Sequence, residues 1–150
     1  MGADTKTVKP DAPKRSNYAE FLSITTRWHD NDAYGHVNNV VYYGYFDTAV
    51  NQYLVQQSAL DIQSSDVIGY VVNSQCDYLK AVAFPDAIEA GIRVNRLGNS
   101  SVQYGIAIFK AGEPECCAHG SFTHVFVNRE TERPAAMPEA LRSALERLQG

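Results

Sequence analysis

The sequence predicts an α+β domain in which a curved antiparallel sheet of about five strands wraps around one long buried helix, with a short helix at the end. One long segment is apolar in nearly every direction, several later segments alternate between apolar and polar residues, and the last stretch is amphipathic. An apolar helix must be covered, and a sheet with one apolar face must cover something. A chain of 150 residues is the right size for one such domain.

The N-terminal part of the chain divides into a leader, a strand and the long helix. Residues 1–20 have no apolar core, and we interpret them as a flexible leader before a domain over residues 21–150. Residues 21–28, FLSITTRW, are rich in β-branched and aromatic side chains and predict the first strand. Residues 40–57, VVYYGYFDTAVNQYLVQQ, are too long for an ordinary strand, contain no proline and predict the helix.

The rest of the chain predicts four strands and a closing helix. Turn sequences at residues 83–87, 97–101 and 110–115 separate the strands. The fourth of these strands is apolar on both faces, whereas in the first three the apolar residues fall on one face. These one-faced sets are Ile68, Tyr70, Val72, Cys76 and Tyr78; Ile88, Ala90, Ile92 and Val94; and Val102, Tyr104, Ile106 and Ile108. A narrow stripe of Leu141, Leu145 and Leu148 predicts a surface helix.

Composition excludes several classes of function. The net charge of −4 argues against a nucleic-acid-binding surface. The chain contains neither a signal peptide nor an apolar run of about 20 residues, so we expect no membrane association and a cytoplasmic location. The three cysteines, two of them adjacent, make a poor disulfide framework and have no zinc-type spacing, which fits a reducing compartment.

The segment HDNDAYGHVNN, residues 29–39, places polar chemistry directly before the apolar helix. If the first strand continues this far, Asp30 and Asp32 share a face while Asn31 points away. Asn38 or Asn39 is a suitable N-cap, and the first amides of a helix lack partners within it. Such amides can stabilise an oxyanion, and a carboxylate folded back across the turn at Gly35 would face them. This combination suits acyl transfer, with the apolar helix lining a tunnel for an acyl group.

The spacing of these polar residues is also compatible with three different roles. An aspartate before a helix more often caps it or forms a turn. A metal cluster of His29, Asp30, Asp32 and His36 is less favoured because the spacings match no ordinary ligand pattern, and we expect no metal. A dehydratase would depend on His36 instead, although a histidine beside a glycine in a turn is more often bonded locally.

The segment RWHDNDAYGHVNNVVYYGYFDTA resembles the signature of the 4-hydroxybenzoyl-CoA thioesterase-like group of hotdog-fold acyl-CoA thioesterases. The shared pattern is Asp-x-Asp-x-x-Gly-His-Val-Asn-Asn followed by an aromatic-rich helix. Later segments resemble the family in the same order, including RLGNSSVQYGIAIF and the closing HVFVNRETERPAAMPEALRSALERL. The resemblance covers residues 22–148 and implies the hotdog fold.

The resemblance also implies roles for individual residues. Asp32 would be the nucleophile or general base toward the thioester carbonyl, and the backbone N–H near Asn39 would polarise the carbonyl oxygen. The residues implied or expected to contact substrate are Gly35, His36, Val37, Asn38, Tyr42, Lys80 and Arg96, with Arg129 and Arg133 as further candidates for coenzyme A phosphates. Tyr34, where some relatives carry a smaller residue or proline, is expected to shape the acyl pocket.

The predicted activity is hydrolysis of an acyl-CoA thioester to a free acid and coenzyme A, with no cofactor beyond the substrate itself. The alternatives are an acyl-carrier-protein thioesterase, a non-catalytic acyl-CoA binding protein and, more weakly, the dehydratase. The active site of this family lies between two subunits. The open side of a sheet wrapped on one helix also favours a second copy, so we expect a homodimer and allow a tetramer made of two dimers.

Overall fold

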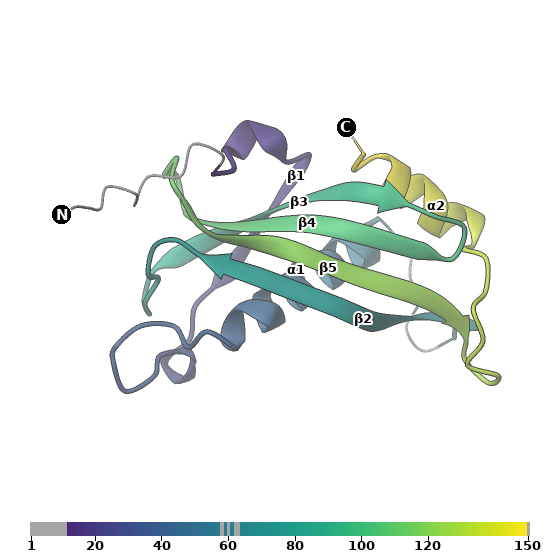
Figure 1. The fold of residues 1–150 in the computed structure, drawn as a ribbon, viewed down its shortest axis with the longest axis horizontal. Helices are drawn as coiled ribbons and strands as arrows, with labels where there is room; N and C mark the ends of the chain where they lie inside the picture. The colour runs from purple at the N-terminus through teal and green to yellow at the C-terminus, as the bar shows by residue number, and fades with distance from the viewer. Residues whose placement is uncertain (1–11, 58, 60, 62–63, 150) are drawn as a thin grey trace.

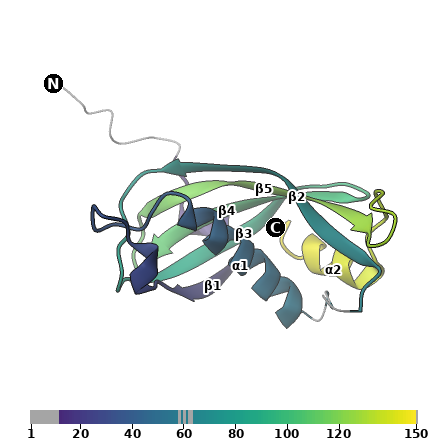
Figure 2. The same cartoon turned by 90° about the horizontal axis from the view of Figure 1, so that it is seen from below.

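A single five-stranded antiparallel sheet curves around a central helix, as the sequence predicts (Figures 1 and 2). The computed structural model describes residues 12–57, 59, 61 and 64–149. The strand order across the sheet is β1-β3-β4-β5-β2. The elements are β1 (Glu20–Thr25), α1 (Val41–Gln56), β2 (Val67–Tyr78), β3 (Ala87–Leu97), β4 (Ser101–Lys110), β5 (Cys116–Asn128) and α2 (Glu139–Glu146).

The inner face of the sheet carries the residues that alternation predicts for β3 and β4. All four predicted inward residues of each of these strands are buried. They pack with the buried side of α1 in one core cluster. The buried residues of α1 are Tyr42, Tyr45, Phe46, Ala49, Val50, Tyr53 and Leu54. The long helix is therefore covered by the sheet, as its apolar sequence requires.

The predicted alternation fails in β2, which is an edge strand. A bulge lies between Val71 and Asn73, so the register with β5 shifts there. Tyr70 and Val71 before the bulge and Val72 within it are all exposed. A one-residue irregularity exchanges the faces of all later side chains, and periodicity in the sequence cannot show where it occurs.

The outer face of the sheet has its own small cluster, which is covered by residues before β1. Tyr18 packs there with Ala107, Phe109 and Cys116. The guanidinium of Arg15 lies over the ring of Phe109 at 4.8 Å and pairs with Glu89 at 2.7 Å. Arg15 and Tyr18, in the second half of the predicted leader, thus contact the outer face of the sheet. Residues 1–11 lie outside the described residues.

The C-terminal helix α2 packs by one edge beside the far end of α1, as predicted (Figure 2). Its Leu141 and Leu145 are buried, and so is Leu148 just after it. The hydroxyl of Tyr53 on α1 donates to the carbonyl of Ala144 at 2.7 Å. These contacts close the end of the core that lies away from the polar segment 29–39.

Candidate functional site

The polar segment forms a short hairpin between the end of β1 and the start of α1. Trp28–Asp30 is a single 3₁₀ turn, and Asn31 and Val37 form an isolated antiparallel bridge. The Asp32 N–H donates to the His36 carbonyl at 2.9 Å. Gly35 has a φ of +84°, a left-handed conformation that favours glycine, which explains the glycine at the tip.

The two aspartates of this segment have different environments. β1 ends at Thr25 rather than continuing through the segment, so Asp30 and Asp32 do not share a strand face. Asp30 is 1% exposed. Its carboxylate accepts hydrogen bonds from the Tyr45 hydroxyl at 2.7 Å and from the Arg27 backbone N–H at 2.9 Å. Asp30 is therefore an internal anchor, and the expectation of a shared face is wrong because the chain turns first.

Hydrogen bonds hold the hairpin against the sheet and the helix. The Asn38 N–H donates to the Asp30 carbonyl at 2.9 Å, and the Val37 N–H donates to the Val82 carbonyl at 2.7 Å. The Asn31 side chain accepts from the Phe84 N–H at 3.0 Å. The hairpin is thus fixed on one side by its own buried carboxylate and on the other by the loop between β2 and β3.

Asp32 lies on this hairpin with its side chain partly exposed. One carboxylate oxygen accepts the Tyr34 N–H at 2.9 Å, which is an Asx turn. Within the described part of the chain, no residue donates to the other oxygen and no hydrogen bond joins this carboxylate to α1. Asp32 therefore presents one carboxylate oxygen without a donor among the described residues, on the hairpin that precedes α1.

The amides at the start of α1 differ in whether they have a hydrogen-bond acceptor. The N-cap residue is Val40, one position later than the sequence predicts. The Asn38 side chain accepts from the Val40 N–H at 3.1 Å, and the Asn38 carbonyl accepts from the Val41 N–H at 2.9 Å. No described residue accepts a hydrogen bond from the Asn39 N–H. This free donor lies where the dipole of α1 adds partial positive charge.

A groove of about 320 Å³ opens at this end of the helix. Five of the predicted site residues line this groove, together with residues at and just after the end of β2. The lining residues are His36, Val37, Asn39, Tyr42, Tyr78, Leu79, Lys80 and Ala81. The structure thus brings together most of the predicted substrate contacts, but Asp32 is not among the residues that line this groove.

Two tyrosines form the inner wall of this groove. Tyr42 and Tyr78 meet edge to face with ring centroids 5.1 Å apart, and the Tyr78 hydroxyl donates to the Asn39 carbonyl at 2.8 Å. Burial raises the pKa of Tyr42 to about 12, so this wall is uncharged at neutral pH. Sequence analysis missed Tyr78 as a site residue, because nothing in a strand pattern shows that its last residue lies against a helix start.

The predicted cationic residues do not all reach the groove. Lys80 lines it and pairs with Glu115 at 2.7 Å, and this hydrogen bond raises the pKa of Lys80. Arg96 is nine residues beyond Ala87 on β3, which places it about 30 Å along the strand from the end near the site. Arg129 and Arg133 follow the end of β5, and the Arg129 N–H donates to the Asp66 carbonyl before β2. Of these four described cationic residues, only Lys80 lines the groove.

Three further expectations concern Tyr34, a metal site and membrane association. Tyr34, expected to shape the acyl pocket, is 88% exposed and does not line the groove, because the tip of the hairpin turns it outward. Over the described ranges, no three histidine, cysteine, aspartate or glutamate side chains are grouped as a metal site would require. Among the described residues, no helix is long and apolar enough to cross a membrane.

Comparison with known proteins gives the class of this fold and then its family. The chain has 60% identity with the PA5185 protein of Pseudomonas aeruginosa strain PAO1, whose crystal structure matches with a TM-score of 0.91 over 93% of this chain and 97% of that one. Slr0204, a 1,4-dihydroxy-2-naphthoyl-CoA thioesterase from Synechocystis, matches in structure with a TM-score of 0.78 at 16% identity, over 87% of this chain and 97% of that one. The architecture is therefore the hotdog-like thioesterase fold.

The sequence alone also identifies the family. Residues 26–145 match the thioesterase-like superfamily, and the chain belongs to it. It is also similar to the protein YsmA of Bacillus subtilis strain 168, at 23% identity over 132 residues, 87% of this chain and 88% of that protein. The matched residues include the whole polar segment, the long helix and all strands after it.

Removal of the Tyr45 hydroxyl tests the anchoring role of Asp30. Burial raises the pKa of Asp30, but hydrogen bonds from Tyr45 and Arg27 outweigh burial and hold it below its ordinary value of 3.8. At pH 7 we expect Tyr45→Phe to lower the free energy of unfolding in urea by about 1–3 kcal/mol. Because the folded pKa is depressed, this stabilisation is complete above the unfolded pKa and is lost as the pH falls through the folded value.

The difference in free energy of unfolding between wild type and Tyr45→Phe should therefore become smaller below about pH 4. Tyr34→Phe is the control, since it removes a hydroxyl from an exposed tyrosine. A Tyr45→Phe protein as stable as the control at pH 7 would contradict the anchoring role.

Proposed function

We propose that this protein hydrolyses an acyl-CoA thioester to a free carboxylic acid and coenzyme A. The observation that carries the proposal is the free Asn39 N–H at the start of a buried helix, at a groove with apolar and aromatic walls. A carbonyl oxygen bonded to this amide gains most stabilisation when it becomes an oxyanion. The name of Slr0204 states an acyl-CoA substrate, which supports this substrate class for a chain of the same fold.

In the proposed reaction, Asp32 acts on the thioester carbonyl carbon from the hairpin. As a general base, it takes a proton from a water molecule whose oxygen adds to that carbon. As a nucleophile, it adds directly and forms an anhydride that water then hydrolyses. In either route the carbon–sulfur bond breaks and the coenzyme A thiolate leaves. The open oxygen of Asp32 is the atom that serves both routes.

We also propose that the site is completed by a second copy of this chain along β2. This edge strand exposes Tyr70, Val71 and Val72. A long apolar strand edge is a site for pairing with another strand, and a two-fold axis would pair β2 with its own copy. A homodimer of this kind covers the open side of α1, and two dimers can associate into a tetramer.

Loss of the Asp32 carboxylate should abolish turnover. We expect Asp32→Ala and Asp32→Asn to lower kcat/KM by at least about a hundredfold, the usual contribution of a catalytic base. Thiol release from a panel of acyl-CoA thioesters measures this directly. Glu130→Ala, which removes an exposed carboxylate from the turn after β5, should retain wild-type activity.

Equal rates for wild type and both Asp32 variants would contradict the role of Asp32. Tight acyl-CoA binding by wild type with no thiol released would instead favour the non-catalytic binding protein. Faster hydrolysis of the same acyl group on an acyl carrier protein would favour the carrier-protein thioesterase.

The Lys80 ammonium should contribute to recognition of coenzyme A phosphate. Lys80→Ala should raise KM for an acyl-CoA by about three- to tenfold and leave KM for the matching acyl-N-acetylcysteamine unchanged, because the truncated thioester has no phosphate. Arg96→Ala is the matched control and should change neither KM, because Arg96 lies about 30 Å along β3 from the end near the groove. An equal effect of Lys80→Ala on both substrates would show that Lys80 acts on the site and not on phosphate.

A charge in the β2 edge should disrupt the proposed dimer. Light scattering of wild type should give at least about twice the protomer mass, and Val72→Asp should give a smaller particle, because a carboxylate at an apolar interface is desolvated without a partner. Thr131→Asp, in the exposed turn after β5, should leave the mass unchanged. A wild-type monomer would contradict the proposed assembly.

A further inference from the structure

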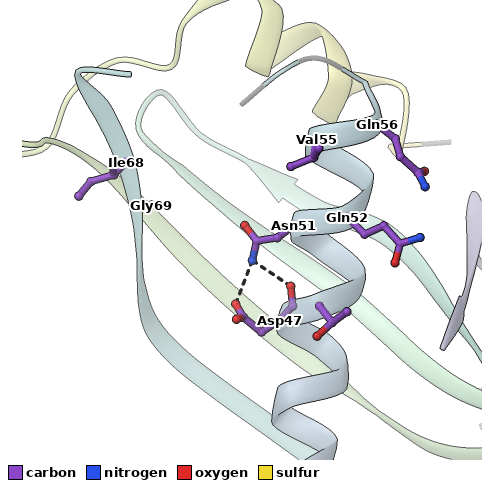
Figure 3. A pocket seen from close by; sticks show the side chains of 8 residues that line it. Asp47, Asn51, Gln52, Val55, Gln56, Ile68 and Gly69 are labelled. Carbon is purple, nitrogen blue, oxygen red and sulfur yellow. Dashed lines mark hydrogen bonds between the residues drawn. The ribbon is translucent and has the colours of Figure 1, made fainter. Parts of the chain in front are cut away.

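A second groove lies between the C-terminal half of α1 and the beginning of β2, away from the groove at the helix start (Figure 3). Tyr78, the last residue of β2, contacts the helix start, whereas Gly69 near its beginning lines the second groove with the C-terminal half of α1. This groove has a volume of about 650 Å³. A notch of about 80 Å³ shares Asp47, Asn51 and Gly69 with it and is closed by residues of β5.

His124 gives this notch a buried nitrogen that lacks a partner. The side chain is 4% exposed, and no described residue bonds its Nδ1. The rings of Tyr104, Phe122 and Phe126 surround it, with centroids 5.0–6.0 Å away. A buried polar atom without a partner is destabilising, and native structures almost always satisfy such atoms with protein, water or ligand. Nδ1 lies on the side of Gly69, which with His124 lines the notch of about 80 Å³, a volume that can hold a polar group.

Gly69 keeps the space beside this nitrogen open. A Cβ atom at position 69 would lie 3.2 Å from His124 Nδ1 and 3.1 Å from the ring of Phe126. Even a methyl group at this position would therefore crowd the imidazole nitrogen and narrow the space beside it. Asp47 and Asn51 face the same groove from α1, as Figure 3 shows.

The groups around the notch favour a hydrogen-bond donor. The Asn51 amide nitrogen already donates to the carbonyl and to the carboxylate of Asp47, at 2.9 and 3.1 Å, so its own oxygen is left as an acceptor. Burial lowers the pKa of His124 and outweighs the opposing charge of Asp47, which keeps the imidazole neutral at pH 7. A hydroxyl can donate to a carboxylate and bond either imidazole tautomer, whereas an anion would be repelled by Asp47.

We propose that the His124 notch binds a hydroxyl group at the distal end of an aliphatic acyl chain. The inference rests on the proposed function, which puts the thioester carbonyl at Asn39. Asn39 and Asp47 are eight residues apart, or about 12 Å along the helix axis, a span of about ten chain carbons. Val55 and Ile68 give the adjoining groove apolar surface for the chain.

Binding of two coenzyme A thioethers tests the notch independently of hydrolysis. We expect S-(10-hydroxydecyl)-CoA to bind wild type at least about tenfold more tightly than S-decyl-CoA in calorimetry, because it satisfies a buried nitrogen. A carboxylate in place of the hydroxyl should bind more weakly than the plain chain. His124→Phe, which removes the nitrogen, and Gly69→Ala, which fills the space, should each abolish the hydroxyl preference.

Two controls repeat these changes elsewhere in the chain. His119→Phe alters a half-buried histidine on the same strand, and Gly44→Ala adds a Cβ that meets nothing within 4 Å. Both should keep the preference. Equal affinities of the two thioethers in wild type, or a preference that survives both His124→Phe and Gly69→Ala, would overturn the inference and leave the notch as a water site. Failure to hydrolyse decanoyl-CoA despite a retained preference would overturn only the proposed function.

Discussion

The hydrogen bonds of the buried Asp30 carboxylate are the constraint on which the candidate site depends. They join the 3₁₀ turn before the hairpin to Tyr45, one turn into α1. The backbone carbonyl of Asp30 also accepts the Asn38 N–H just before the helix. One residue thereby fixes both where the hairpin ends and where α1 begins. The hairpin that carries Asp32 and the backbone that leads to the Asn39 N–H are both tied to this anchor.

Much of the fold could be predicted from the sequence because burial imposes simple periods on it. The alternation of β3 and β4 and the apolar length of α1 each correspond to a buried face. The fold differs from the prediction at features that the periodicity of apolar residues does not indicate. The bulge between Val71 and Asn73 is a local backbone event, and the packing of Tyr18 and Arg15 on the outer face depends on residues far away in sequence.

The site was predicted less completely than the fold for the same physical reason. The spacing of residues placed Asn39 and His36 near the helix start. It could not distinguish the buried Asp30 from the partly exposed Asp32, because both are aspartates and they are two residues apart. Charge identified Lys80 and Arg96 alike, although only topology shows that they lie at opposite ends of the sheet. The sequence did not indicate His124 as a site residue. Only the structure shows that its Nδ1 lacks a hydrogen-bond partner and lies beside a glycine of another strand.

The central claim is that a thioester carbonyl fits between the Asn39 amide and the Asp32 carboxylate. The most direct measurement is a crystal structure with a ketone analogue of an acyl-CoA, in which a methylene replaces the thioester sulfur. We expect the ketone oxygen within about 3 Å of the Asn39 nitrogen, with Asp32 reaching the carbonyl carbon directly or through one water molecule. An analogue whose carbonyl binds elsewhere, or with Asp32 turned away from it, would contradict the account.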